Sequence, residues 1–88
     1  MMKIYKYPLE NKSVTVLELP RASEILHVGT DPLGHVCVWA RFAENNEAMT
    51  ERRAICIVGT GQEHEADLRF LSTFVQGPYV WHAFESPL

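Results

Sequence analysis

The sequence has no cluster of basic residues. Its eight Lys and Arg residues are scattered, with Arg52-Arg53 the only adjacent pair, and the formal charge is −3. Proteins that bind nucleic acid usually present a basic face that displaces counterions from the phosphates. Direct binding to nucleic acid is therefore not expected, and the charge is better suited to a partner with a basic surface.

Cysteine is scarce as well. Cys37 and Cys56 are the only two, and each lies inside an apolar stretch. Small secreted scaffolds are usually held together by four or more cysteines. We expect two free thiols in a reducing cytosol. A disulfide between them would need adjacent strands of suitable geometry, which the sequence does not establish.

Long hydrophobic runs are also missing. Residues 1–7 lack the apolar region of a signal peptide, and no apolar run approaches the ~18 residues of a membrane span. An 88-residue chain of ordinary globular composition has room for one domain, here residues 1–88. These features predict a soluble, single-domain cytoplasmic protein with no membrane partner.

What the sequence does contain is a series of short strand patterns, separated by turn signals about every ten residues. The candidate strands are residues 3–9, 14–19, 25–28, 35–42, 55–58, 68–75 and 79–84. They predict a mainly β protein, either a small antiparallel β-sandwich or a partly open barrel. Residues 68–75 also fit one face of a helix, so an α+β fold with one helix near residues 66–74 is the alternative. The aromatic and β-branched residues there favour a strand.

Two strand pairings are expected from the turns. A polar turn separates residues 3–9 from residues 14–19, which predicts an opening hairpin. The turn sequence Asp31-Pro32-Leu33-Gly34 lies between residues 25–28 and 35–42 and predicts a second hairpin.

The apolar run at residues 55–58 ends abruptly in Gly59-Thr60-Gly61 and predicts a central strand that leads to a tight surface turn. Free backbone N–H groups in such a turn can form a nest for phosphate or carboxylate. A phosphate loop would add a lysine and a following helix, which are absent here. We therefore expect the glycines to serve the turn itself. The candidate binding residues on this loop are Gly59, Thr60, Gly61, Glu63 and His64.

The segment after the turn is acidic. Glu63, His64, Glu65 and Asp67 could bind a divalent ion weakly, but a dedicated site would need a further His or Cys at suitable spacing. We expect a solvated loop, with no metal and no cofactor. The serines lack a nucleophile elbow, and no cysteine is paired with a histidine on a catalytic loop. No catalytic residue is assigned, and enzyme activity is not expected.

Large aromatic residues are numerous for so short a chain. Some must fill the core, because each buries a large area. If Trp39 points outward together with Tyr79 or Trp81, the pair would mark a contact patch, because aromatic residues dominate interface hot spots. Trp39 and Trp81 are therefore added to the candidate binding residues.

Short motifs spread over nearly the whole chain carry a resemblance. They are Met2-Lys3-Ile4-Tyr5-Lys6-Tyr7, Glu18-Leu19-Pro20, Ile25-Leu26-His27-Val28, Val38-Trp39-Ala40, Val58-Gly59-Thr60-Gly61, Leu71-Ser72-Thr73-Phe74 and His82-Ala83-Phe84-Glu85. In this order they resemble an uncharacterised family of short proteins encoded by phages and prophages. That family commonly has a His directly after Gly-Thr-Gly, where this chain has Gln62. It has no assigned chemistry, so the resemblance implies a genomic setting alone.

Together these features predict a small non-enzymatic phage or prophage accessory protein that binds a host protein in the host cytoplasm. Inhibition of a defence system or of another host component is the leading hypothesis. One alternative is an oligomeric sponge that sequesters a nucleotide signal at the Gly-Thr-Gly turn. Its phosphate partners would come from the arginines Arg41, Arg52, Arg53 and Arg69. A second alternative is a structural accessory protein of the virion or its assembly. A third is a weak hydrolase, which would need a His and a carboxylate that converge in a cleft.

Overall fold

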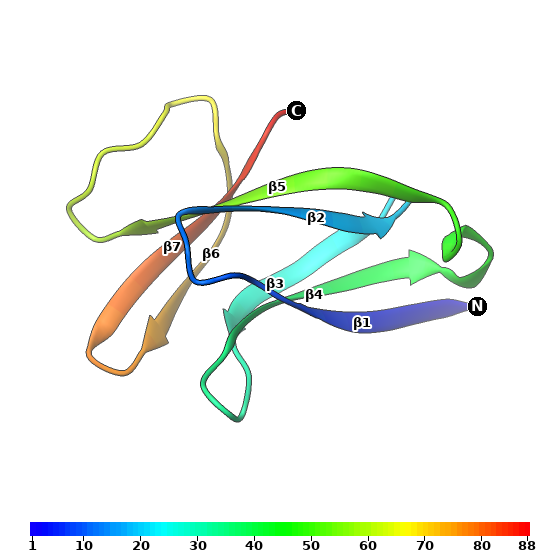
Figure 1. The fold of residues 1–88 in the computed structure, drawn as a ribbon, viewed down its shortest axis with the longest axis horizontal. Helices are drawn as coiled ribbons and strands as arrows, with labels where there is room; N and C mark the ends of the chain where they lie inside the picture. Colours follow the sequence, from blue (N-terminus) through cyan, green and yellow to red (C-terminus); the bar gives the residue numbers. More distant parts are fainter.

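The computed structural model describes all 88 residues and consists of two antiparallel β-sheets packed against each other (Figure 1). The strands are β1 (Met2–Pro8), β2 (Val14–Pro20), β3 (Glu24–Thr30), β4 (Val36–Ala43), β5 (Thr50–Gly59), β6 (Arg69–Gln76) and β7 (Tyr79–Ser86). The predicted mainly β, sandwich-like fold is confirmed, and the α+β alternative is excluded because β6 is a strand. The one helical element is the 3-10 helix η1 (Glu44–Asn46). No helix of the structure is long and apolar enough to cross a bilayer.

The strand order is β1-β4-β3 in the three-stranded sheet and β2-β5-β7-β6 in the four-stranded sheet. β5 is hydrogen-bonded to β2 on one side and to β7 on the other, so its predicted central position is confirmed. Along β4, the alternate residues Val38, Ala40 and Phe42 are each at most 1% exposed. This period of two places one face of β4 in the core, as its apolar alternation predicts.

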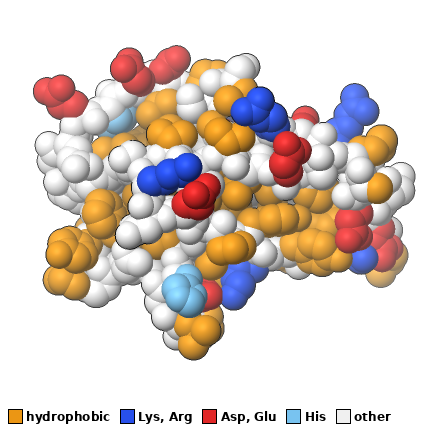
Figure 2. Space-filling model, in the orientation of Figure 1, with side chains coloured by type: hydrophobic (Ala, Val, Ile, Leu, Met, Phe, Trp, Pro, Cys, Tyr) orange, Lys and Arg blue, Asp and Glu red, His pale blue; other side chains and the backbone are white.

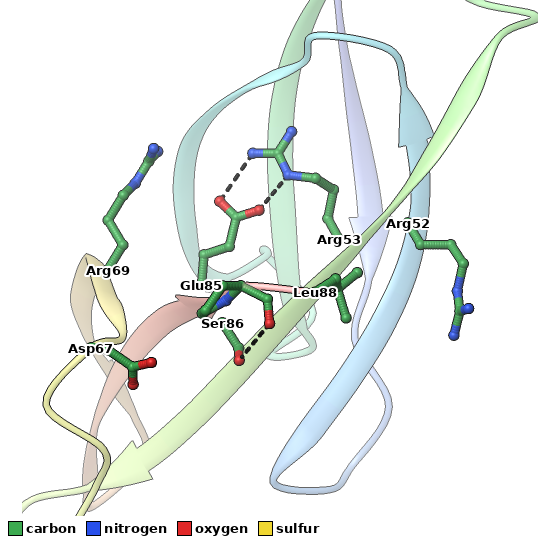
Figure 3. A pocket seen from close by; sticks show the side chains of 8 residues that line it. Arg52, Arg53, Asp67, Arg69, Glu85, Ser86 and Leu88 are labelled. Atoms are coloured by element: carbon green, nitrogen blue, oxygen red, sulfur yellow. Dashed lines mark hydrogen bonds and ion pairs between the residues drawn. The ribbon is translucent and has the colours of Figure 1, made fainter.

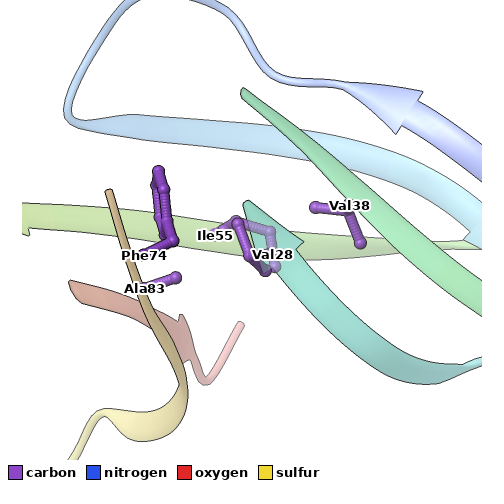
Figure 4. Close-up of a cluster of buried hydrophobic side chains, with 5 residues drawn as sticks. All are labelled: Val28, Val38, Ile55, Phe74 and Ala83. Atoms are coloured by element: carbon purple, nitrogen blue, oxygen red, sulfur yellow. The ribbon is translucent and has the colours of Figure 1, made fainter. Parts of the chain in front are cut away.

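The core lies between the two sheets (Figure 4). Its central cluster takes residues from five strands, namely Val28, Val38, Ile55, Phe74 and Ala83. Full burial of a Val, Ile or Phe side chain stabilises the fold by about 1.5–3 kcal/mol. Because each sheet contributes part of this cluster, neither sheet buries its apolar face without the other.

The predicted opening hairpin is wrong. β1 pairs with β4, and β2 pairs with β5 in the other sheet. The connection between them crosses from sheet to sheet: Leu9 N–H donates to Val36 O at 2.9 Å, and Ile57 N–H donates to Ser13 O at 2.8 Å. With the two strands in separate sheets, Tyr7 of β1 and Leu17 of β2 can both pack against the core, one from each sheet.

The predicted hairpin of β3 and β4 is confirmed, and Asp31 organises its turn. The carboxylate accepts hydrogen bonds from the backbone N–H groups of Leu33 (3.0 Å) and His35 (2.9 Å) and from Lys6 Nζ (3.0 Å). Lys6 and these backbone donors lower the pKa of Asp31 from 3.8 to about 2. The turn is therefore held by an ionised carboxylate that also ties β1 to it.

A side chain joins the two sheets along one edge. Ser72 on β6 donates a hydrogen bond to Val28 O (2.6 Å) and accepts one from Val28 N–H (3.1 Å) on β3. The register of β6 shifts between Phe70 and Ser72, as at a β-bulge. At this edge the serine hydroxyl thus bonds β6 to β3 in place of backbone hydrogen bonds between the two strands. The two sheets remain separate and do not close into a barrel.

The connection from β5 to β6 crosses the outside of the molecule. β7 lies between these two strands and is antiparallel to both, so β5 and β6 run parallel. His64, in the middle of the connection, stacks on Phe84 of β7 with ring centroids 4.5 Å apart. Since Ala83 faces the core, the neighbouring Phe84 faces outward. The loop of residues 60–68 therefore passes over the outer side of β7.

Both cysteines are free thiols. Cys37 is buried on β4, and Cys56 is half-buried on β5 of the other sheet. Burial raises the pKa of both thiols. Neither is therefore an activated nucleophile, because nucleophilic attack requires the thiolate.

Candidate functional site

Most side chains on the outward side of the four-stranded sheet are uncharged; Glu18 and Arg52 lie at one end of it, on β2 and β5. Cross-strand partners share a face, and the register aligns Val14, Cys56, Phe84 and Phe70 in one row across all four strands. We use the term outer face for the ten residues Val14, Val16, Cys56, Val58, Phe70, Thr73, Val75, Val80, His82 and Phe84. Several are well exposed, such as Val75 at 61%, Phe70 at 56% and Val14 at 46%. Exposed apolar residues gathered on one side of a small protein often mark an interaction surface.

His82 is the most polar group of the outer face, and its partners come from both neighbouring strands. Its Nε2 atom lies 2.8 Å from Thr60 Oγ1, at the end of β5, and its Nδ1 atom lies 2.9 Å from Thr73 Oγ1 on β6. Both ring nitrogens are thus hydrogen-bonded within the chain. A partner could cover this histidine without leaving an unpaired polar group, which would otherwise cost about 1–3 kcal/mol.

A hollow of about 260 Å³ lies between the Gly-Thr-Gly turn and the outer side of β7. It is lined by Val58, Gly59, Thr60, Gly61, Gln62, His64, His82 and Phe84. The structure thus brings four of the five candidate loop residues together, and adds His82 and Phe84 to them. No arginine or lysine lines the hollow.

The two glycines of the turn serve different purposes. Gly61 has φ +91°, a conformation that favours glycine, although a Cβ there would meet no other atom. At Gly59, a Cβ would lie 3.2 Å from Gln62 Oε1 and 3.3 Å from Trp81 Cζ3. The Gly59 N–H donates to Gln62 Oε1 at 2.6 Å. Gln62 therefore occupies one of the backbone donors that a phosphate nest would need.

Acidic side chains gather beside the outer face, over the β5–β6 loop (Figure 2). Glu63, Glu65 and Asp67 are exposed, and none of them takes part in an ion pair. No group of three or more His, Cys, Asp and Glu side chains is arranged to hold a metal ion. We call this loop the acidic rim; it is negatively charged and lies against the outer face at Phe84 of β7, on which His64 stacks.

The two tryptophans face different sides of the molecule, and only Trp81, the cross-strand partner of Gly59, lies next to the Gly-Thr-Gly turn. Trp39 faces outward from the three-stranded sheet, where its ring centroid lies 6.0 Å from that of His27. Trp81 faces inward, packs against the core and donates from Nε1 to Gln76 Oε1 at 3.1 Å. Trp39 and Trp81 therefore do not share one contact patch.

Three of the four arginines proposed for a nucleotide site gather elsewhere, and the fourth, Arg41 on β4, pairs with Glu24. Arg52, Arg53 and Arg69 line a depression of about 390 Å³ near the end of β7 (Figure 3). Arg53 forms a bidentate pair with Glu85, which raises the pKa of the guanidinium. Six residues of extended strand, about 20 Å, separate Arg53 from Gly59. These cations are therefore not placed to neutralise a phosphate at the Gly-Thr-Gly turn.

A model of the family described as "Domain of unknown function (DUF7352)" matches residues 1–88. The chain belongs to this family. No curated protein and no solved structure matches it significantly. The predicted resemblance to an uncharacterised family is confirmed to that extent. Because the match spans the whole chain, it includes both sheets, the outer face and the loop that crosses β7.

The sequence alone does not reveal the outer face as a unit. Thr73, Val75 and His82 belong to two neighbouring strands, and their proximity depends on the β6–β7 register. One signal was available: His82 and Phe84 alternate with Trp81 and Ala83, so that β7 is largely apolar on both sides. A strand of this kind is typical of a sheet covered on both faces.

Proposed function

We propose that this protein acts without catalysis, by binding a host protein through the outer face. The observation that carries the proposal is the group of ten uncharged residues of the outer face, which come from four strands and whose one imidazole is already hydrogen-bonded on both nitrogens. Four strands about 4.8 Å apart and roughly 20 Å long span on the order of 400 Å². With the rim loop added, this suits one side of a small or transient interface.

The acidic rim specifies the chemistry of the partner. The complementary surface has an apolar centre and basic side chains opposite Glu63, Glu65 and Asp67. Since these carboxylates have no partner within the chain, they are free to attract such a surface, and the net charge of −3 adds to this attraction. A second copy of the chain would bring the same acidic loop and is a poorer match.

The absence of a carboxylate from the hollow favours binding over catalysis. No carboxylate lines it, so His82 lacks the charged group that usually orients and stabilises a catalytic imidazole. The hydroxyl groups of Thr60 and Thr73 occupy both of its nitrogens. These contacts support a structural task for His82, namely joining β5, β7 and β6 across the outer face.

The resemblance to phage and prophage proteins supplies the setting for the proposal. In this setting we take the partner to be a host factor that the protein blocks, with a defence component as the leading case. In this role the protein works in the host cytoplasm and needs no cofactor.

The test uses two matched substitutions. Val75→Glu places a charge on the outer face, and Leu33→Glu places the same charge on the β3–β4 turn, where Leu33 is 80% exposed. The wild type and both variants are used to capture proteins from host lysate, and a captured protein is then purified and titrated against each. We expect a 1:1 complex that Val75→Glu weakens at least tenfold and Leu33→Glu leaves unchanged. Raising the salt concentration should also weaken it.

Two results would contradict the proposal. A captured protein that binds Val75→Glu as tightly as the wild type would place the interface elsewhere. A purified chain that is itself a dimer, and becomes a monomer on Val75→Glu, would show that the outer face is occupied by a second copy. That result would favour the structural accessory role. Light scattering after gel filtration distinguishes these cases.

A further inference from the structure

The largest cavity of the molecule lies at an open end of the sandwich, away from the outer face. It is a cleft of about 780 Å³ between the two sheets. Sites for small molecules in proteins typically measure about 300–1,000 Å³ and are often found at the mouths of β-barrels. The nearest comparable depressions here, at about 390 and 260 Å³, are much smaller.

The walls of this end cleft are fixed by bonds between the sheets. On one side, the connection of residues 9–13 is tied at Leu9 to Val36 of β4 and at Ser13 to Ile57 of β5. On the other side, Gln76 Nε2 donates to Gly34 O at 3.2 Å and so joins β6 to the β3–β4 turn. A cleft framed in this way does not have to be ordered by its ligand, which lowers the entropic cost of binding.

Apolar side chains form its lining nearest the core, and Trp81 is the largest of them. Val36, Ile57 and Trp81 all line the cleft and pack against the buried cluster. The indole is held in place by its hydrogen bond to Gln76, and it lies close enough to Gly59 that an added Cβ there would be 3.3 Å from Trp81 Cζ3. A fixed indole is a stacking platform for a flat ring, and such stacking contributes about 1–3 kcal/mol per nucleobase.

The polar groups at the mouth restrict the charge of a ligand. Glu10 and Lys12 lie 3.4 Å apart and compensate each other. The amide of Asn11 and the Nε2 group of Gln62 have no partner within the chain. Because Gln62 Oε1 already accepts from Gly59 N–H, the group that Gln62 offers a ligand is a pair of N–H donors. Donors of this kind match carbonyl oxygens.

We propose that the end cleft binds an uncharged, flat heterocycle that carries carbonyl groups, of the kind found in a pyrimidine nucleoside. The ring stacks on Trp81, and its carbonyl oxygen accepts from Gln62 Nε2. A phosphate group is disfavoured because the cleft has no uncompensated cation. This site is independent of the outer face and does not rest on the function proposed above.

The test is a titration of the ¹⁵N-labelled protein, followed through the Trp81 indole N–H signal. The probes are uridine, uridine monophosphate and glucose. Uridine should shift this signal and the Gln62 side-chain amide saturably, the monophosphate should bind several-fold more weakly, and glucose should give no saturable shift. Gln62→Glu keeps the oxygen that accepts from Gly59 N–H but removes the N–H donors of the side chain. It should weaken the binding of uridine at least tenfold.

Asn45→Asp is the matched control, because it also replaces an amide by a carboxylate, at an exposed residue of η1 that does not line the cleft. It should bind uridine as the wild type does. Three results would overturn the proposal. They are an absence of saturation by uridine at its solubility limit, equal binding by Gln62→Glu with the Gly59 amide signal unchanged, or an equal response to glucose.

Discussion

The bond between Ser72 and Val28 gives the sharpest test of how the two sheets are held together. Val28 is fully buried on β3, the edge strand of its sheet. Its N–H and C=O point away from β4, toward the serine hydroxyl. In an antiparallel strand both groups of one residue point to the same side, so Val28 cannot use them on β4. Ser72→Ala removes both hydrogen bonds and leaves two backbone groups without a partner.

The expected cost is large for so small a domain. Two lost hydrogen bonds at about 1 kcal/mol each, together with the unpaired backbone groups, should lower the free energy of unfolding by about 2–3 kcal/mol. A chain of this length has a total stability of roughly 4–13 kcal/mol. The melting temperature should fall by about 10–20 °C. Urea denaturation measures the free energy, and hydrogen exchange at the Val28 amide locates the change.

Two control variants separate the hydrogen bonds from other effects of the substitution. Ser72→Thr keeps the hydroxyl and should lose less than half as much stability as Ser72→Ala. Ser13→Ala removes an exposed hydroxyl that makes no hydrogen bond and should be neutral. A loss below about 0.5 kcal/mol for Ser72→Ala, with unchanged exchange at Val28, would refute the role assigned to Ser72.

Other predictions concern the turns. Because the folded pKa of Asp31 lies near 2, below its ordinary 3.8, its stabilisation is complete above about pH 5 and is lost as the pH falls toward 2. Asp31→Asn should flatten this part of the acid denaturation curve and lower stability at pH 7; an unchanged curve would contradict the assignment. Gly61→Ala should cost about 1–2 kcal/mol through φ strain alone. Gly59→Ala should act differently, through the contact that its new Cβ would make with the Trp81 ring, and should shift the indole signal of Trp81.

Most of the strand positions could be predicted because they depend on local properties of the sequence. These are the turn-forming residues between strands and the alternation of apolar and polar residues along each strand. The turn at Asp31 to Gly34 is encoded by four consecutive residues, and the core face of β4 follows from its alternate apolar residues. The partner of a strand is not a local property. The polar residues after Pro8 are compatible with a hairpin and equally with a crossing between sheets, and only packing of the whole core decides between them.

The candidate site could be predicted only in part, for the same reason. A Gly-Thr-Gly turn after an apolar strand locates a surface loop from the sequence alone. The pairing of Thr60 with His82, 22 residues away, requires β5 and β7 to be neighbours with a known register. The stacking of His64 on Phe84 further requires that the loop cross the outer side of β7.

The distribution of hydrophobic residues bears on why the outer face exists. Ten hydrophobic residues are buried, whereas fourteen large ones are exposed, in a chain whose size leaves little stability to spare. Exposed apolar residues are ordinary when scattered, but here the register aligns Val14, Val16, Phe70, Val75 and Val80 on one face. Side chains that face water contribute little to the stability of the isolated fold. Polar replacements such as Val75→Thr should therefore leave stability within about 0.5 kcal/mol while weakening partner binding. If such replacements instead lowered stability as core substitutions do, the outer face would be part of the fold rather than a surface for a partner.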